Sequence, residues 1–148
     1  MGVVTLRWVD GLMMVGTDSN GHSIVIGKSP ENKDEIAGMK PSDLLLLAAA
    51  SCAAYDVIEI LRKQREPMRD LKIECQGDQE VEPPYTFTRI HINYLIVGRV
   101  DPIKAEKAIK LSEEKYCSVI STLRPGVPIT SSFEISEGKN QAESEVKG

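Results

Sequence analysis

The sequence predicts an α+β fold in which antiparallel strands pack with helices and one helix is central. Two observations support this class. Segments with the two-residue alternation of β-strands lie toward both ends of the chain, and a long apolar segment rich in Leu and Ala lies between them. The chain has 148 residues, which is the size of one domain. We therefore expect a single domain over residues 1–136, followed by a polar, disordered tail over residues 137–148.

The N-terminal segments predict an antiparallel meander. Residues 3–9 alternate, and Asp10-Gly11 is typical of a two-residue hairpin turn. Residues 12–15 then form the returning strand. A second turn over residues 18–21 leads to a third strand over residues 22–26.

The central segment predicts a helix from Ser42 to about Arg65. Pro41 and Asp43 suit its first turn, and Pro67 follows its end. The first half of this helix is apolar on all sides, so it must be covered on all sides. One small sheet covers only one face of this helix. A second copy of the chain is the simplest way to cover the remaining apolar faces. The pattern therefore favours a homodimer.

The remaining segments complete the predicted order βββ-α-ββ-αα-β. Residues 71–76 and 86–97 read as strands, and residues 102–115 as a helix that Asp101 caps. A further helical stretch surrounds Cys117, and residues 127–135 form the last strand. In the longest strand, four side chains are expected to point inward and three outward: Ile90, Ile92, Tyr94 and Ile96 against Arg89, His91 and Asn93.

Composition excludes several classes of function. The net charge is −4 and no stretch is strongly basic, so nucleic acid is not expected as a partner. The N-terminal residues carry no pattern of a secretory signal, and the apolar run Leu44–Tyr55 is too short to span a bilayer. We therefore expect a soluble, cytoplasmic protein that does not enter membranes. The three cysteines and two histidines lack metal-site spacing, so no metal is expected.

Cys52 lies in the middle of the predicted central helix and admits two interpretations. A free cysteine there is commonly an inert core residue. As a nucleophile it would need help, because Asp56 and Glu59 share its helix face and acidic neighbours raise the pKa of a thiol. A reactive Cys52 therefore predicts a nearby arginine. Arg7 and Arg89 are the candidates, and the alternative for both is an ordinary charge on a solvated strand.

The other cysteines differ in context. Cys117 is expected near a helix start, where a thiol becomes more acidic. Cys75 alternates with Leu71 and Ile73 and is interpreted as packing. His91 falls on the polar face of its strand, which disfavours a Cys–His hydrolase.

Two segments resemble the signatures of the OsmC-like family. Gly38–Cys52, which reads GMKPSDLLLLAAASC, is similar to the first signature, in which a proline opens the central helix and small residues precede the reactive cysteine. Tyr116–Val119 is similar to the second signature, which holds the resolving cysteine. The separation of the cysteines, 117 − 52 = 65, also agrees with the family. The resemblance covers roughly residues 3–136.

The resemblance implies a fold of antiparallel sheets wrapped around long central helices in an intertwined homodimer. It also implies a thiol-dependent peroxidase that acts on organic hydroperoxides or hydrogen peroxide without metal or flavin cofactors. Cys52 would become a sulfenic acid, Cys117 would condense with it, and a dithiol such as a lipoylated protein would reduce the disulfide.

The resemblance is incomplete around the acid and the arginine that activate the cysteine in the family. Ser42 stands where the family carries an activating Glu, so Asp43 and Asp56 are the candidate replacements. Arg7 lies close to the expected arginine, and Ser118 stands where the family usually carries a proline. The alternative functions are a non-peroxidase that binds a hydrophobic small molecule or senses through its thiols, and an interaction dimer without a ligand.

Overall fold

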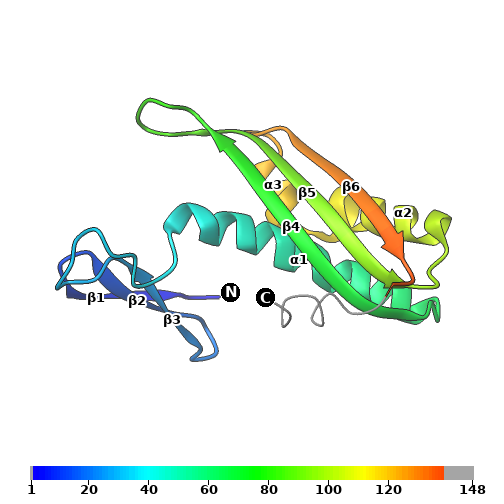
Figure 1. Ribbon diagram of the computed structural model, residues 1–148, viewed down its shortest axis with the longest axis horizontal. Helices are drawn as coiled ribbons and strands as arrows, with labels where there is room; N and C mark the ends of the chain where they lie inside the picture. The colour runs from blue at the N-terminus through cyan, green and yellow to red at the C-terminus, as the bar shows by residue number, and fades with distance from the viewer. Residues whose placement is uncertain (1, 139–148) are drawn as a thin grey trace. The chain divides into compact units, whose positions relative to one another are not determined.

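The computed structural model describes residues 2–138 and contains the predicted order of strands and helices (Figure 1). The α+β class is confirmed. The chain forms two compact units, one reaching to Leu45 and one starting at Leu46. The single domain over residues 1–136 stays a prediction. Most of the tail predicted over residues 137–148 lies outside the described residues.

The first unit is the predicted meander. Strands β1 (Thr5–Asp10), β2 (Met13–Thr17) and β3 (Ser23–Gly27) pair antiparallel in that order. Gly11 forms the first turn with a φ of +54°, in the left-handed region that suits glycine. A Cβ on Gly27 would lie 1.8 Å from the Leu12 carbonyl oxygen, so glycine is required there by space as well as by its φ of +100°.

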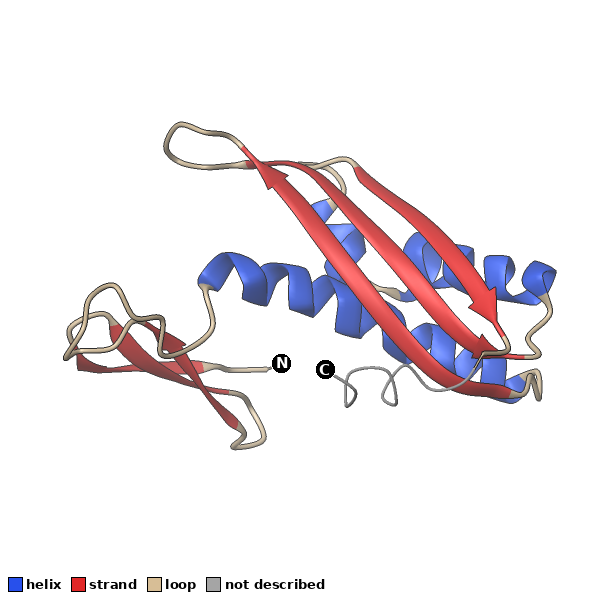
Figure 2. Ribbon diagram, in the orientation of Figure 1, coloured by secondary structure: helices blue, strands red, loops and turns tan. Residues whose placement is uncertain are grey.

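The second unit contains a three-stranded sheet and the helices that cover one of its faces (Figure 2). Strands β4 (Met68–Gln79) and β5 (Phe87–Gly98) pair antiparallel, and β6 (Ile129–Ser136) pairs parallel to β5. The parallel pair differs from the antiparallel pairing expected for this sheet. The chain reaches it through a helical crossover after β5, the kind of connection that parallel neighbours need.

Helix α1 (Pro41–Lys63) packs its small residues against the sheet. Ala49, Ala53, Val57 and Leu61 recur every four residues, form one face of the helix and are buried. They join the four inward side chains of β5, which are buried as predicted, in a single core cluster. Each of these buried isoleucines contributes about 1.5–3 kcal/mol through removal of apolar surface from water.

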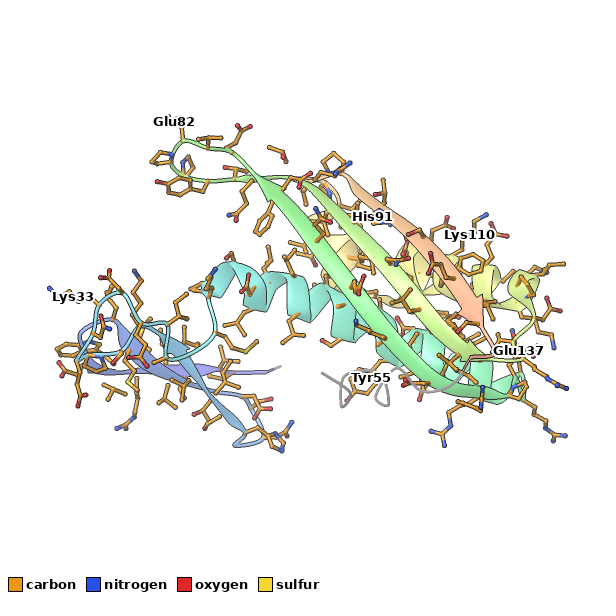
Figure 3. The ribbon with its side chains drawn as sticks, viewed as in Figure 1. Lys33, Tyr55, Glu82, His91, Lys110 and Glu137 are labelled. Atoms are coloured by element: carbon orange, nitrogen blue, oxygen red, sulfur yellow. The ribbon has the colours of Figure 1, made fainter. Side chains whose placement is uncertain are left out.

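The described residues leave the opposite part of α1 exposed. Leu47 is 49% exposed and Tyr55, which projects from the helix (Figure 3), is 75% exposed. Among the described residues α1 is the one helix long and apolar enough to cross a membrane, judged by length and composition alone. The core helix of a soluble protein passes the same test.

The predicted helix over residues 102–115 is divided. Helix α2 (Pro102–Leu111) begins at Asp101, whose carboxylate accepts from the Ile103 backbone N–H as expected for a cap. A π-helical turn, η1 (Ser112–Tyr116), follows it, and α3 (Ser118–Leu123) begins after Cys117. The chain thus changes direction at Cys117, whose backbone is extended with φ −73° and ψ 103°.

Candidate functional site

Two cysteines that are 65 positions apart in the sequence meet in the second unit. Cys52 lies halfway along α1 and is partly exposed, whereas Cys117 is 2% exposed between η1 and α3. Both are free thiols, and each shifts the pKa of the other. Their pairing in a reaction, inferred from the resemblance, stays a prediction.

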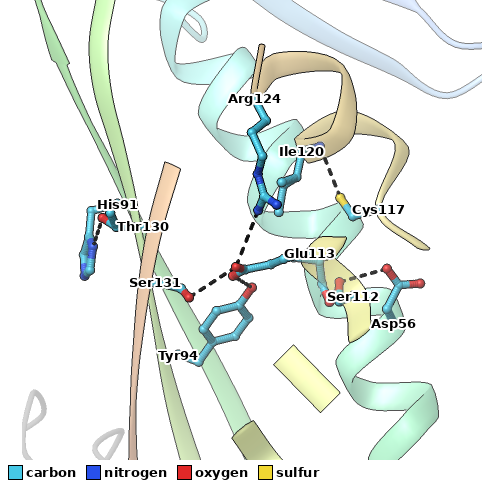
Figure 4. A network of polar contacts seen from close by, with 11 residues as sticks. Asp56, His91, Tyr94, Ser112, Glu113, Cys117, Ile120, Arg124, Thr130 and Ser131 are labelled. Atoms are coloured by element: carbon cyan, nitrogen blue, oxygen red, sulfur yellow. Dashed lines mark hydrogen bonds and ion pairs between the residues drawn. The ribbon is translucent and has the colours of Figure 1, made fainter. Parts of the chain in front are cut away.

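Backbone and side-chain hydrogen bonds hold Cys117 in this position (Figure 4). Its backbone N–H donates to the Ser112 carbonyl at 2.7 Å, and its sulfur accepts from the Ile120 N–H at 3.4 Å. The Ser112 hydroxyl donates to Asp56 at 2.9 Å and lies 3.4 Å from the Ala53 carbonyl. Because Ala53 and Asp56 follow Cys52 by one and four residues, Ser112 fastens the Cys117 turn to the helix that carries Cys52.

The pKa values of the two thiols are shifted in opposite directions. Burial alone would raise the pKa of Cys52, but hydrogen bonds from the Cys117 thiol, the Val119 N–H and the Ser118 hydroxyl outweigh it and lower that pKa. The charge of Asp56 opposes the lowering. Burial, followed by the neighbouring Cys52 sulfur, raises the pKa of Cys117 to about 11. The pair therefore holds its first negative charge on Cys52 and keeps the proton on Cys117.

Glu113 anchors the same turn on its other side, against the sheet (Figure 4). Its carboxylate accepts from the Tyr94 hydroxyl at 3.1 Å and from the Ser131 hydroxyl at 3.2 Å, and Arg124 lies 3.9 Å away. The Glu113 side chain is only 10% exposed. Burial and then Glu113 raise the pKa of Tyr94, which stays a donor. The π turn is thus fixed both to α1 and to the sheet.

The sequence contained no local signal for Ser112 or Glu113. Both fall where a regular helix was predicted, and their partners are remote in sequence: 56 residues for Ser112 with Asp56 and 19 for Glu113 with Tyr94. Asp56 was predicted as a site residue, and it contacts the Cys117 turn through Ser112.

The other predicted charges belong to other elements. Arg7 is on β1 and Asp43 is in the first turn of α1, both in the unit that ends at Leu45, and their roles stay predictions. Arg89 pairs with Asp78 at 2.9 Å on the sheet. The charge of Asp56 raises the pKa of Cys52.

Cys75 and His91 are engaged in other contacts. Burial raises the pKa of Cys75, which packs against the core cluster from β4. His91 lies on the sheet (Figure 3), with Nδ1 2.7 Å from the Thr130 hydroxyl and Nε2 2.8 Å from the Ser132 hydroxyl. Within residues 2–138 no cluster of three or more His, Cys, Asp or Glu side chains is arranged to hold a metal ion.

Comparison with known proteins gives the family. A family model described as OsmC-like protein matches residues 31–132, which include both Cys52 and Cys117. Protein YhfA of Escherichia coli K12 is 34% identical over 131 residues, which cover 88% of this chain and 95% of YhfA. The chain belongs to the OsmC-like family.

Solved structures share this fold. A hypothetical protein from Aquifex aeolicus superposes with a TM-score of 0.78 at 31% identity, covering 91% of this chain and 97% of that one. The organic hydroperoxide resistance protein OhrB of Bacillus subtilis superposes with a TM-score of 0.61, covering 90% and 98% of the two chains. At 20% identity, that second likeness shows the shared fold alone.

Proposed function

We propose that this OsmC-like protein is a thiol-dependent peroxidase that reduces organic hydroperoxides or hydrogen peroxide through Cys52. The observation that carries the proposal is the polarised cysteine pair. Cys52 is partly exposed and has the lowered pKa, while the buried Cys117 keeps its proton. The thiolate is the nucleophilic form of cysteine. In this proposal Cys52 is therefore the attacking cysteine and Cys117 the resolving cysteine.

The proposed reaction has two balanced steps. The Cys52 thiolate attacks one oxygen of the O–O bond, forming an S–O bond, and the departing oxygen takes a proton to become an alcohol or water. Cys52 is then a sulfenic acid. Cys117 attacks that sulfur, the S–O bond breaks, and the hydroxyl leaves with the Cys117 proton as water. A Cys52–Cys117 disulfide results.

Return to the starting state requires a reductant. A small or protein-bound dithiol, such as a lipoylated protein, attacks the disulfide, forms its own disulfide and leaves Cys52 and Cys117 as thiols. Such a cycle suits the reducing cytoplasm, where we place the protein.

The proposed active form is a homodimer. Helix α1 leaves Leu47 and Tyr55 exposed, and the β1–β3 sheet leaves large apolar side chains such as Trp8, 72% exposed, without cover. Three short strands that bury little apolar surface are not stable alone. A second copy of the chain supplies a surface of matching apolar character.

The test measures peroxide consumption and the oxidation state of the cysteines in the same protein. The wild-type protein should consume cumene hydroperoxide with a dithiol present, and one equivalent of peroxide without reductant should give a Cys52–Cys117 disulfide by mass spectrometry. Cys52→Ser should lose consumption, while Cys75→Ser, the matched control, should retain it. Two free thiols after peroxide treatment would contradict the proposal.

One observation favours a second candidate, a thiol sensor. The charge of Asp56 opposes ionisation of Cys52. A sensor would form the disulfide once but would not turn over with a dithiol. Repeated turnover in the same assay excludes this candidate.

A further inference from the structure

Two arginines flank one strand pair at the end of the sheet where β4 begins and β5 ends. Met68 of β4 is paired with Gly98 of β5, and the register then shifts before Asp70, so Arg69 is the extra residue of a β-bulge. Arg99 directly follows Gly98. Bulges redirect the side chain of the extra residue and are common beside functional sites.

The backbone between these arginines is closely packed and borders a cavity. Gly98 has a φ of +134°, and a Cβ there would lie 2.3 Å from the Pro67 carbonyl oxygen, so only glycine permits this approach. Pro67, Arg69, Arg99 and Glu137 line a surface cavity of about 410 Å³. Sites for small molecules commonly have volumes of about 300–1,000 Å³. The cavity is therefore large enough for a small ligand.

Both arginines contact Glu137, which directly follows β6 at this end of the sheet (Figure 3). Arg69 Nη2 donates to the Glu137 backbone carbonyl at 2.8 Å, and Arg99 Nε lies 3.6 Å from Glu137 Oε2. The neighbouring carboxylates of Asp70 and Asp101 accept from backbone N–H groups close to them in sequence. Glu137 thus supplies acceptors to two guanidinium groups at once.

The two acceptor oxygens of Glu137 define the chemistry of a ligand. The carbonyl carbon and the carboxylate carbon of a glutamate are separated by three carbons, Cα, Cβ and Cγ. Glutarate has the same three-carbon spacer between two carboxylates. On Arg69 it would replace a neutral carbonyl by a carboxylate, and hydrogen bonds between charged groups are the stronger. The guanidinium group also matches the geometry of a carboxylate.

We propose that Arg69 and Arg99 form a binding site for a small dicarboxylate with a three-carbon spacer, and that Glu137 occupies this site when no ligand is bound. Glu137 is a weak competitor, because the Arg99 and Glu137 side chains are 84% and 66% exposed and exposed ion pairs contribute little. The site uses neither Cys52 nor Cys117, so the proposal does not depend on the peroxidase function.

The test is a titration of the full-length, ¹⁵N-labelled protein with glutarate, followed by NMR through the guanidinium Nε–H signals of Arg69 and Arg99. Malonate, which has one carbon between its carboxylates, is the matched probe, and NaCl keeps the ionic strength constant. Glutarate should shift both signals to saturation. Malonate should bind at least about tenfold more weakly, because it is too short to make both charge-assisted contacts.

Four variants assign the binding to this site. Arg69→Gln and Arg99→Gln should each weaken glutarate binding by about tenfold. Arg89→Gln removes the same charge at the opposite end of β5 and should leave the affinity unchanged. Glu137→Gln should tighten binding by about two- to fivefold, because it removes the competing carboxylate.

Several outcomes of the titration would overturn the proposal. Signals that drift without saturation, or that respond equally to malonate and glutarate, would mean that the arginines respond to anions in general. An effect of Arg89→Gln as large as that of Arg99→Gln would assign the binding to net charge. An unchanged affinity in Glu137→Gln would show that Glu137 does not occupy the site.

Discussion

The two compact units solve the problem of apolar burial in different ways. The unit from Leu46 onward closes a core of its own, in which Ile90, Ile92, Ile96 and Leu61 are almost completely buried. The unit up to Leu45 exposes apolar side chains on its strands, and Ile26 is its one buried hydrophobic residue among those described. The comparison indicates that the second unit carries most of the apolar burial and the cysteine pair, whereas the first buries little apolar surface.

The strongest test of this contrast pairs one truncation in each unit. Ile92→Ala should lower the free energy of unfolding by about 2–5 kcal/mol, because it leaves a cavity in a filled core. Leu6→Ala, at an exposed position, should change it by less than about 0.5 kcal/mol in dilute protein. Urea unfolding followed by circular dichroism measures both.

The variants Ile92→Ala and Leu6→Ala also test whether the chain forms oligomers. If a second copy covers the first unit, the Leu6→Ala effect should grow with protein concentration, because oligomers are stabilised by mass action. The Ile92→Ala effect should hardly depend on it. A Leu6→Ala effect as large as that of Ile92→Ala in dilute protein would break the comparison.

A charge on the exposed face of α1 should separate assembly from folding. Tyr55→Asp places a carboxylate on a residue that is 75% exposed in the single chain, so the fold of the second unit should persist. Burial of that charge in a dimer is strongly unfavourable. We expect light scattering to report monomers for Tyr55→Asp and dimers for wild type. Lys63→Asp, at the exposed end of the same helix, serves as the charge control.

A smaller effect is expected at the junction that joins the two cysteines. Ser112→Ala removes the donor to Asp56 in a fully buried position and should cost about 1–3 kcal/mol of stability. It should also slow formation of the Cys52–Cys117 disulfide after a peroxide pulse, because the Cys117 turn loses its tie to α1. Thr122→Ala, which removes an exposed hydroxyl bond within α3, is the control for a general loss of hydrogen bonding. Equal disulfide rates in wild type and Ser112→Ala would contradict this role.

The contrast also explains what the sequence could predict. The order of the elements and the inward side chains of β5 follow from local periodicity, and the structure confirms them. The parallel pairing of β6 and the π turn at Ser112 depend on contacts between remote segments, which no local pattern records.

The acidity of Cys52 was harder to predict from the sequence. The expected arginine stays a prediction, and the groups that lower the pKa of Cys52 are the Cys117 thiol, the Val119 N–H and the Ser118 hydroxyl. The Val119 N–H and the Ser118 hydroxyl are neutral groups of a kind that every protein contains many times. The Cys117 thiol is the partner cysteine itself. Residue type alone does not mark these groups, because only the folded turn brings them near Cys52.

The last effect concerns stability against pH, and its sign differs between the two thiols. The pKa of Cys52 is lowered from the ordinary 9.0, so its contribution is present above pH 9 and is lost as the pH falls through its folded value. The pKa of Cys117 is raised to about 11, so its contribution is present below pH 9 and is lost as the pH rises toward 11.

The pair should therefore give the reduced protein a stability maximum near pH 9. Thermal unfolding of wild type and Cys117→Ser, compared at each pH, isolates the thiols from the other titrating groups. The difference between the two should shrink from pH 9 to pH 11. A difference that stays constant over that range would mean that Cys117 does not hold the shared proton, and the division of the pair into an attacking and a resolving cysteine would lose its physical basis.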